Sequence, residues 1–191
     1  MAKQAKTLNE QELRRVVDYV ATRKHAVRNR CIVLTSFLSG MRVGEIANLK
    51  YSDVVTADNK IKTEIYLTAD QTKGSEGRRV FINNKLRKEY QKYITDYQPQ
   101  SPQDKFFYSQ KGKSVGFTPN SLAQYFHYLY RSAQIEGASS HSGRRSFATT
   151  ISSKGVGIKV LQKLLGHKNI QTTSVYIFAS DDMLRKAVEV L

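Results

Sequence analysis

Two short motifs place arginine beside groups that could hold it against a phosphate. Arg42 follows the helix-breaking Gly40 and precedes Glu45 by three residues, so the carboxylate could fix the guanidinium. His141 and Arg144 are also three apart and would project from one face of a helix. Both side chains can donate to phosphate oxygens, and arginine can do so through two parallel bonds. Alone, each motif is more commonly a surface ion pair or a basic helix start.

A histidine and a tyrosine near the C-terminus could complete a site for phosphodiester exchange. His167 comes directly after Gly166, which fits the position just past a helix end, and Tyr176 follows nine residues later. Most of the 11 tyrosines must be packing residues, so Tyr176 is singled out only by the arginine and histidine motifs that accompany it in the sequence. Exchange without a metal needs a nucleophile, a base, guanidinium groups for the transition-state charge and an acid for the leaving oxygen. With Lys73 in a polar loop, the chain supplies each group.

The motifs occur in the order and at the separations of one known family. From about Thr7 to its C-terminus the chain resembles the catalytic domain of the tyrosine recombinases, also called phage integrases. The residues that carry the resemblance are Arg42 with Glu45, His141 with Arg144, the triplet Leu165-Gly166-His167, and Tyr176. The resemblance implies site-specific DNA cleavage and rejoining, in which Tyr176 forms a 3′-phosphotyrosyl link and releases a 5′ hydroxyl.

The resemblance also implies roles for the other polar residues. Arg42 and Arg144 would clamp the scissile phosphate. His141 would act as general base or phosphate donor, and His167 would donate to a non-bridging oxygen. Lys73 in Gln71-Thr72-Lys73-Gly74-Ser75 matches the place of the family's general acid, in the loop of a β-hairpin. A metal is not expected, because the four histidines lack a paired metal-binding spacing and the chain has a single cysteine. ATP is not expected, because the phosphotyrosyl bond conserves the energy for rejoining.

Two local departures from the family pattern concern residues beside the catalytic positions. Gly143 precedes Arg144 where members often have leucine, and glycine costs about 1 kcal/mol against alanine inside a helix. We therefore expect a looser helix start there. Ile177 and Phe178 follow Tyr176 where many members carry a histidine, which we interpret as packing around the nucleophile. Neither change removes a chemical group.

The larger departure concerns domain organisation. Most members have an N-terminal helical core-binding domain that clamps DNA together with the catalytic domain. Residues 1–191 are instead expected to form a single catalytic domain without that clamp. The chain would then be either an excised fragment or a short natural member, and the Met1-Ala2-Lys3-Gln4 start favours the second.

The charge of the chain favours a polyanionic partner. Its 31 Lys+Arg against 16 Asp+Glu give a net charge of +15, and neutralising phosphates releases counterions. An anionic membrane surface or a merely basic protein are the alternatives, but double-stranded DNA is the expected partner. We expect DNA-backbone contacts from the basic residues near the motifs: Lys50, Arg78, Arg79, Arg145 and Lys168.

Hydrophobic periodicity predicts the elements that position these residues. Apolar spacing indicates helices over 27–39, 43–49, 142–153, 158–165 and 182–190, and further helices after Thr7, after residue 85 and from Pro119. Thr7 and Glu10 have the spacing of a capping box. Alternation over 61–67 and 79–82 predicts a β-hairpin whose turn carries Lys73. The expected fold is mainly α with a small antiparallel β-sheet, an α+β arrangement.

The last predicted helix has an apolar stripe of Met183, Leu184, Ala187, Val188 and Leu191. The stripe either covers the chain's own core or docks on a neighbouring subunit, which would make the protein a homo-oligomer on DNA. An accessory DNA-bending protein is a further expected partner. Without an apolar leader or a span of membrane length, we expect a cytoplasmic protein, associated with the nucleoid when acting, and no membrane partner.

Two other functions stay open from the sequence. A type IB topoisomerase-like enzyme would use the same chemistry to relax DNA without strand exchange. A non-catalytic DNA-binding accessory protein could share the fold. The complete set of six catalytic side chains favours the site-specific recombinase over the binding-only protein.

Overall fold

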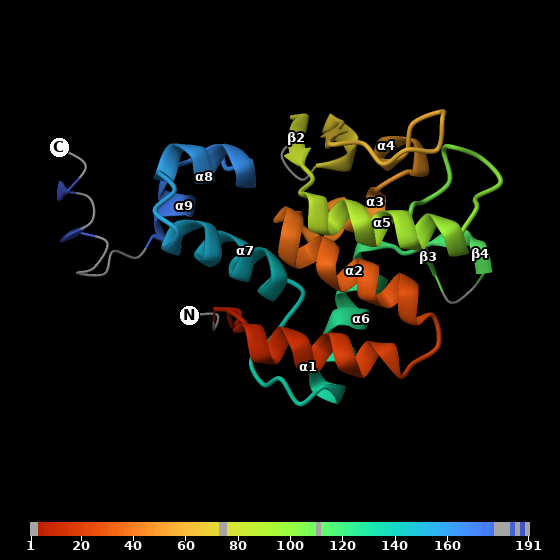
Figure 1. Cartoon of the computed structure of the whole chain (residues 1–191), viewed down its shortest axis with the longest axis horizontal. Coiled ribbons are helices and arrows are strands. Elements are labelled where there is room, and N and C mark those ends of the chain that lie inside the picture. Colours follow the sequence, from red (N-terminus) through yellow and green to blue (C-terminus); the bar gives the residue numbers. More distant parts are fainter. Residues whose placement is uncertain (1–3, 73–75, 110–111, 178–183, 186–187, 190–191) are drawn as a thin grey trace.

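The fold is mainly helical, as the sequence predicted, and its described residues form two small antiparallel sheets where one was expected (Figure 1). The computed structural model describes residues 4–72, 76–109, 112–177, 184–185 and 188–189. The helices are α1 (Glu10–Ala21), α2 (Ala26–Ser39), α3 (Val43–Asn48), α4 (Tyr51–Val54), η1 (Ala69–Gln71, a 3-10 helix), α5 (Asn84–Asp96), α6 (Pro119–Ser132), α7 (Ser142–Ser153), α8 (Ile158–Leu165) and α9 (Gln171–Ser174). The strands are β1 (Glu64–Leu67), β2 (Arg78–Phe81), β3 (Tyr108–Ser109) and β4 (Gly112–Gly116).

Helix α2 forms the centre of the molecule. It packs against α1, α5 and α7 (Figure 1). Its residues Cys31 to Leu34 are all buried. A helix that is covered on several sides needs apolar or small residues around its whole circumference, which explains why its sequence shows no strong polar face. The end of α2 at Gly40 leads directly into the segment that carries Arg42. A buried scaffold therefore holds the first arginine of the candidate site.

The predicted hairpin is the β1–β2 pair. Ile65 faces Val80 in register, and both are buried, whereas Tyr66 and Phe81 point to solvent. This alternation is the one that the sequence predicted, although Ile61 forms only an isolated bridge with Val55 before the strand begins. The second pair, β3–β4, forms a separate two-stranded sheet, in which Tyr108 faces Gly116.

Two helix starts differ from their predictions. The capping box of α1 is formed by Asn9 and Glu12, so the assignment to Thr7 and Glu10 was wrong: the Asn9 side chain accepts from the Glu12 N–H at 2.8 Å. Gly143 does not loosen the start of α7. A Cβ there would overlap the side chain of Ser36, so glycine allows α7 to approach α2 closely and brings Arg144 inward.

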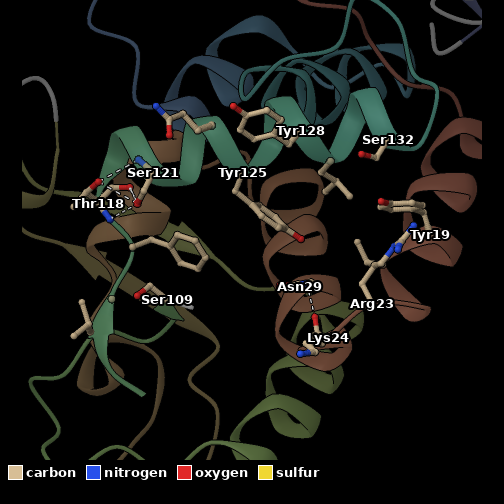
Figure 2. Close-up of a pocket in the computed structure, with 16 residues that line it drawn as sticks. Tyr19, Arg23, Lys24, Asn29, Ser109, Thr118, Ser121, Tyr125, Tyr128 and Ser132 are labelled. Carbon is tan, nitrogen blue, oxygen red and sulfur yellow. Dashed lines mark hydrogen bonds between the residues drawn. The ribbon is translucent and has the colours of Figure 1, made fainter. Parts of the chain in front are cut away.

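A cavity of about 740 Å³ lies between α1, α6 and β4. Figure 2 shows Tyr19, Arg23 and Tyr125 among the side chains around it. None of the five predicted catalytic residues that the structure describes (Arg42, His141, Arg144, His167 and Tyr176) lines it. Separately, no helix in the described part of the chain is long and apolar enough to cross a membrane.

Two buried tyrosines on α5 and α6 should respond oppositely to loss of their hydroxyl groups. The Tyr93 hydroxyl donates to the Phe106 carbonyl at 2.9 Å, whereas the Tyr130 hydroxyl has no partner among the described residues. Both side chains are 1% exposed. We expect Tyr130→Phe to raise the free energy of unfolding by about 1 kcal/mol and Tyr93→Phe to lower it by about 1 kcal/mol. Urea unfolding measures both; equal destabilisation by the two changes would mean that the Tyr130 hydroxyl is satisfied.

Candidate active site

A second cavity, of about 400 Å³, lies where the start of α3, the β1–β2 hairpin and the turn between α8 and α9 meet. Segments far apart in the sequence therefore form one site. Its lining residues are Arg42, Thr72, Glu76, Gly77, Arg78, Gly166, His167, Lys168, Asn169 and Thr172. Basic side chains from three elements thus face a space that could admit a phosphate.

Arg42 is fixed at the mouth of this cavity by Glu45, as its spacing predicted. The Arg42 backbone N–H donates to Glu45 Oε2 at 2.7 Å, and Arg42 Nη1 donates to Oε1 at 2.9 Å. The Arg42 side chain remains 29% exposed, whereas that of Glu45 is 1% exposed. The carboxylate is thus buried behind a guanidinium that stays accessible to a ligand.

Arg78 binds the other side of the same carboxylate. Its Nε donates to Glu45 Oε1 at 3.1 Å and its Nη2 to Oε2 at 2.7 Å. Burial opposes ionisation of Glu45, but the hydrogen bond and charge of Arg78, followed by those of Arg42, outweigh it and hold the pKa of this carboxyl below its usual value. Glu45 is therefore ionised and shared between two arginines.

Arg144 is buried deeper in the site. Its Nη1 donates to the Gly40 carbonyl at 2.6 Å, and its Nη2 donates to the Leu165 carbonyl at 2.7 Å. Burial, followed by the charge of Arg42, lowers the pKa of Arg144 to about 9, which leaves it charged at neutral pH. The guanidinium is therefore held by two backbone carbonyls, at the end of α2 and the end of α8.

His167 connects Arg144 to α9. Arg144 Nη2 lies 2.9 Å from His167 Nε2, and His167 Nδ1 lies 2.9 Å from Thr173 Oγ1. A guanidinium only donates, so Nε2 must accept and the ring proton must lie on Nδ1, donated to Thr173. Burial, then the charges of Arg144, Arg42 and Arg78, lowers the pKa of His167 to about 4. The ring is neutral and orients Arg144; donation to a phosphate oxygen would require Nε2 to gain a proton and leave Arg144.

The neutral state of His167 predicts a pH effect on stability. The pKa is lower in the folded chain than the ordinary value of 6.5, so the unfolded chain binds the proton more readily. Stability from this group is complete above the ordinary pKa and is lost as the pH falls toward about 4. We expect wild-type stability, measured by urea unfolding, to fall more between pH 7 and pH 5 than that of His167→Asn. His127→Asn, on the exposed side of α6, is the control and should follow wild type.

Tyr176 lies beside this pair of residues. Its ring stacks on His167 with centroids 6.2 Å apart and an interplanar angle of 21°. It packs on a small apolar cluster that includes Leu161 and Leu165, and the Arg145 guanidinium lies 5.7 Å from its ring centroid. Residues of α7 and α8 therefore hold the half-buried tyrosine beside His167.

The remaining predicted catalytic residues are placed differently. His141 is exposed at the N-terminus of α7, three residues before Arg144. Lys73 lies outside the described residues. Thr72 and Glu76, which flank residues 73–75, line the cavity. Thr72 Oγ1 donates to the Glu76 carbonyl at 2.7 Å. The ends of the segment that carries Lys73 therefore meet at the site.

The basic residues expected on the DNA backbone fall into different environments. Lys168 pairs with Glu76 at 2.8 Å on the rim of the cavity, and Arg145 contacts Tyr176. Arg79 is 65% exposed on the outer face of β2, and Lys50 is half-buried before α4. Arg78 differs from all of these, because its side chain is 9% exposed and bonded to Glu45.

Sequence reasoning missed two contributors to the site. Thr173 was not singled out, yet it is fully buried and holds His167. Arg78 was grouped with Arg79, although alternation along β2 could have separated them. Three guanidinium groups, of Arg42, Arg78 and Arg144, accompany one carboxylate, so these four residues carry two uncompensated positive charges. In the described part of the chain, no three His, Cys, Asp or Glu side chains gather as a metal site would require.

Comparison with known proteins agrees with the geometry. The chain is 30% identical over 184 residues to the tyrosine recombinase XerA of Pyrococcus furiosus, across 96% of this chain and 61% of that protein. The crystal structure of XerA recombinase matches with a TM-score of 0.73 at 27% identity, over 95% of this chain and 63% of that one. The Tn1549 transposon integrase, in complex with transposon right end DNA, matches with a TM-score of 0.74 at 17% identity, over 98% and 66%, which shows a shared fold.

The chain spans 47% to 62% of the length of the curated relatives that it matches. It covers 95% of the catalytic domain of bacteriophage HP1 integrase, with a TM-score of 0.66 at 22% identity, which again shows a shared fold. The description of the matching family model is "Phage integrase family", and the match runs from residue 6 to residue 183. It thus includes every residue of the cluster around Arg144, which consists of Arg42, Glu45, Arg78, Arg144, His167 and Tyr176. The chain belongs to the phage integrase family.

Proposed function

We propose that this protein is a site-specific recombinase that cleaves and rejoins DNA through Tyr176. The observation that carries the proposal is the cluster in which Tyr176 stacks on His167 while His167 accepts from Arg144. A tyrosine beside buried cations, in a chain of this family, is suited to attack on a phosphodiester.

The proposed reaction conserves the phosphodiester bond. The Tyr176 oxygen attacks phosphorus and loses its proton to His141, which we assign as general base. The bond from phosphorus to the 5′ oxygen breaks, and Lys73, as general acid, protonates that oxygen. A 3′-phosphotyrosyl link and a free 5′ hydroxyl result, and attack by a 5′ hydroxyl reverses the steps to rejoin a strand.

Electrostatics supports this assignment. The transition state carries more negative charge on its oxygens than the substrate, and donors held in place before the reaction stabilise that charge. Arg42 and Arg144 are held by bonds to Glu45 and to backbone carbonyls. The two uncompensated positive charges of the cluster match the charge of the transition state.

The proposed substrate is double-stranded DNA. The net charge of +15 suits a polyanion, and Lys50, Arg79, Arg145 and Lys168 are the proposed contacts to its backbone. Strand exchange between two duplexes requires several protomers, and we assign their contact to the helix that the sequence predicts at residues 182–190. Leu184 and Val188, the described members of its apolar stripe, are 57% and 65% exposed; Met183, Ala187 and Leu191 lie outside the described residues. An accessory DNA-bending protein completes the proposed assembly.

Covalent capture tests the function without knowledge of the target sequence. The protein is incubated with a library of nicked duplexes in which cleavage releases a short strand, so that rejoining is prevented. The expected result is a denaturation-resistant protein–DNA adduct, and mass spectrometry should locate the nucleotide on the tryptic peptide that contains Tyr176. A folded protein that binds the library but forms no adduct, or one linked through another residue, would contradict the proposal.

A further inference from the structure

Two adjacent arginines on β2 that look equivalent in sequence have opposite surroundings. The Arg78 side chain is 9% exposed, whereas the Arg79 side chain is 65% exposed and 3.9 Å from Glu64. Successive side chains of a strand point to opposite faces, so Arg78 turns toward the cluster and Arg79 toward solvent. Arg78 is therefore much less accessible to a DNA backbone than Arg79.

Arg78 and Arg42 bind the same two oxygens of Glu45. Arg78 donates to Oε1 at 3.1 Å and to Oε2 at 2.7 Å; Arg42 donates to Oε1 from Nη1 and to Oε2 from its backbone N–H. The carboxylate lies between them and is 1% exposed. The position of Arg42 therefore depends on how Arg78 orients Glu45.

Arg78 also holds the turn that carries His167. Its Nη1 donates to the Leu164 carbonyl at 3.0 Å, and Arg42 Nη2 lies 3.4 Å from the Gly166 carbonyl. Gly166 has φ +61°, and a Cβ there would lie 2.5 Å from Arg78 Cδ. The two arginines thus bind two carbonyls of one turn, those of Leu164 and Gly166. The glycine leaves room for the Arg78 side chain.

We propose that Arg78 is a positioning residue that sets the separation of Arg42 and His167 around the scissile phosphate, and that it does not bind the DNA backbone. Through its bonds to Glu45 and to the Leu164 carbonyl, it joins the hairpin to α3 and α8. This inference rests on the proposed recombinase function, because its effect is measured on the cleavage step.

The test separates cleavage from DNA binding in three full-length variants. Arg78→Gln and Arg78→Lys are expected to lower the single-turnover cleavage rate at saturating DNA by about 10–10²-fold, with an unchanged Kd and salt dependence. Lysine should not restore the cleavage rate, because one ammonium group cannot reproduce the three hydrogen bonds that Arg78 donates to Glu45 and to the Leu164 carbonyl. Arg79→Gln is the matched comparison and should raise the Kd and reduce the salt slope by about 1.

A double variant separates positioning from general destabilisation. If Arg78 acts through Glu45, adding Arg78→Lys to Glu45→Gln should lower the cleavage rate by far less than it does in wild type. The inference would be overturned if the loss of cleavage rate in the double variant equalled the product of the losses in the two single variants. Full activity in Arg78→Lys, or a reduced salt slope in Arg78→Gln, would overturn it as well. Wild-type protein run in parallel keeps the two proposals distinct, since absence of its adduct would contradict the proposed function instead.

Discussion

Replacing Tyr176 with phenylalanine is expected to abolish the covalent protein–DNA adduct and DNA cleavage while leaving DNA binding within about twofold of wild type. Phenylalanine keeps the ring that stacks on His167 and packs on Leu161 and Leu165, so the local fold should persist. It lacks the oxygen that would attack phosphorus, and no covalent intermediate can form without it. Denaturing gels after incubation with the nicked library measure the adduct, and gel shifts measure the Kd.

Tyr128→Phe provides the matched control for that change. Tyr128 lies on α6, is 62% exposed, and takes no part in the cluster around Arg144. This variant should form the adduct at the wild-type rate. An adduct in Tyr176→Phe, or equal loss in both variants, would show that Tyr176 is not the nucleophile.

Local patterns in the sequence predicted the elements of the site well. The ends of α7 and α8 agree with their predicted bounds, because apolar spacing and Gly166 mark them. The β1–β2 hairpin follows from simple alternation of buried and exposed side chains. The start of α1 was misplaced because Thr7 and Asn9 can both cap a helix, and only the structure shows which side chain accepts the hydrogen bond.

The contacts inside the site could not be predicted in the same way. Arg144 bonds to the Gly40 carbonyl across 104 positions of the chain, and backbone carbonyls have no sequence signature. The resemblance to a family indicated that Arg144 and His167 act together, but it did not show that His167 accepts from Arg144. Gly143 was misjudged because helix propensity says nothing about Ser36, which belongs to the neighbouring helix.

The same contacts explain why charge alone should be insufficient at position 144. The Arg144 guanidinium reaches the Gly40 carbonyl, the Leu165 carbonyl and His167 Nε2 from two different nitrogens. Lysine offers one compact ammonium group on a different stem, so it cannot satisfy these acceptors and also face a phosphate. Acceptors left without donors cost about 1–3 kcal/mol of stability each when buried.

Arg144→Lys is therefore expected to lower the single-turnover cleavage rate at saturating DNA by at least about 10²–10³-fold, as loss of a preorganised donor does elsewhere. Arg145→Lys is the control: its guanidinium contacts the Tyr176 ring through a cation–π interaction of about 0.5–1 kcal/mol, which lysine can partly retain. That control should lose no more than about fivefold. Thermal unfolding shows whether each variant is folded at the assay temperature. A loss in Arg144→Lys no larger than the loss in Arg145→Lys would mean that Arg144 acts by charge alone and that its bonds to the backbone only stabilise the fold.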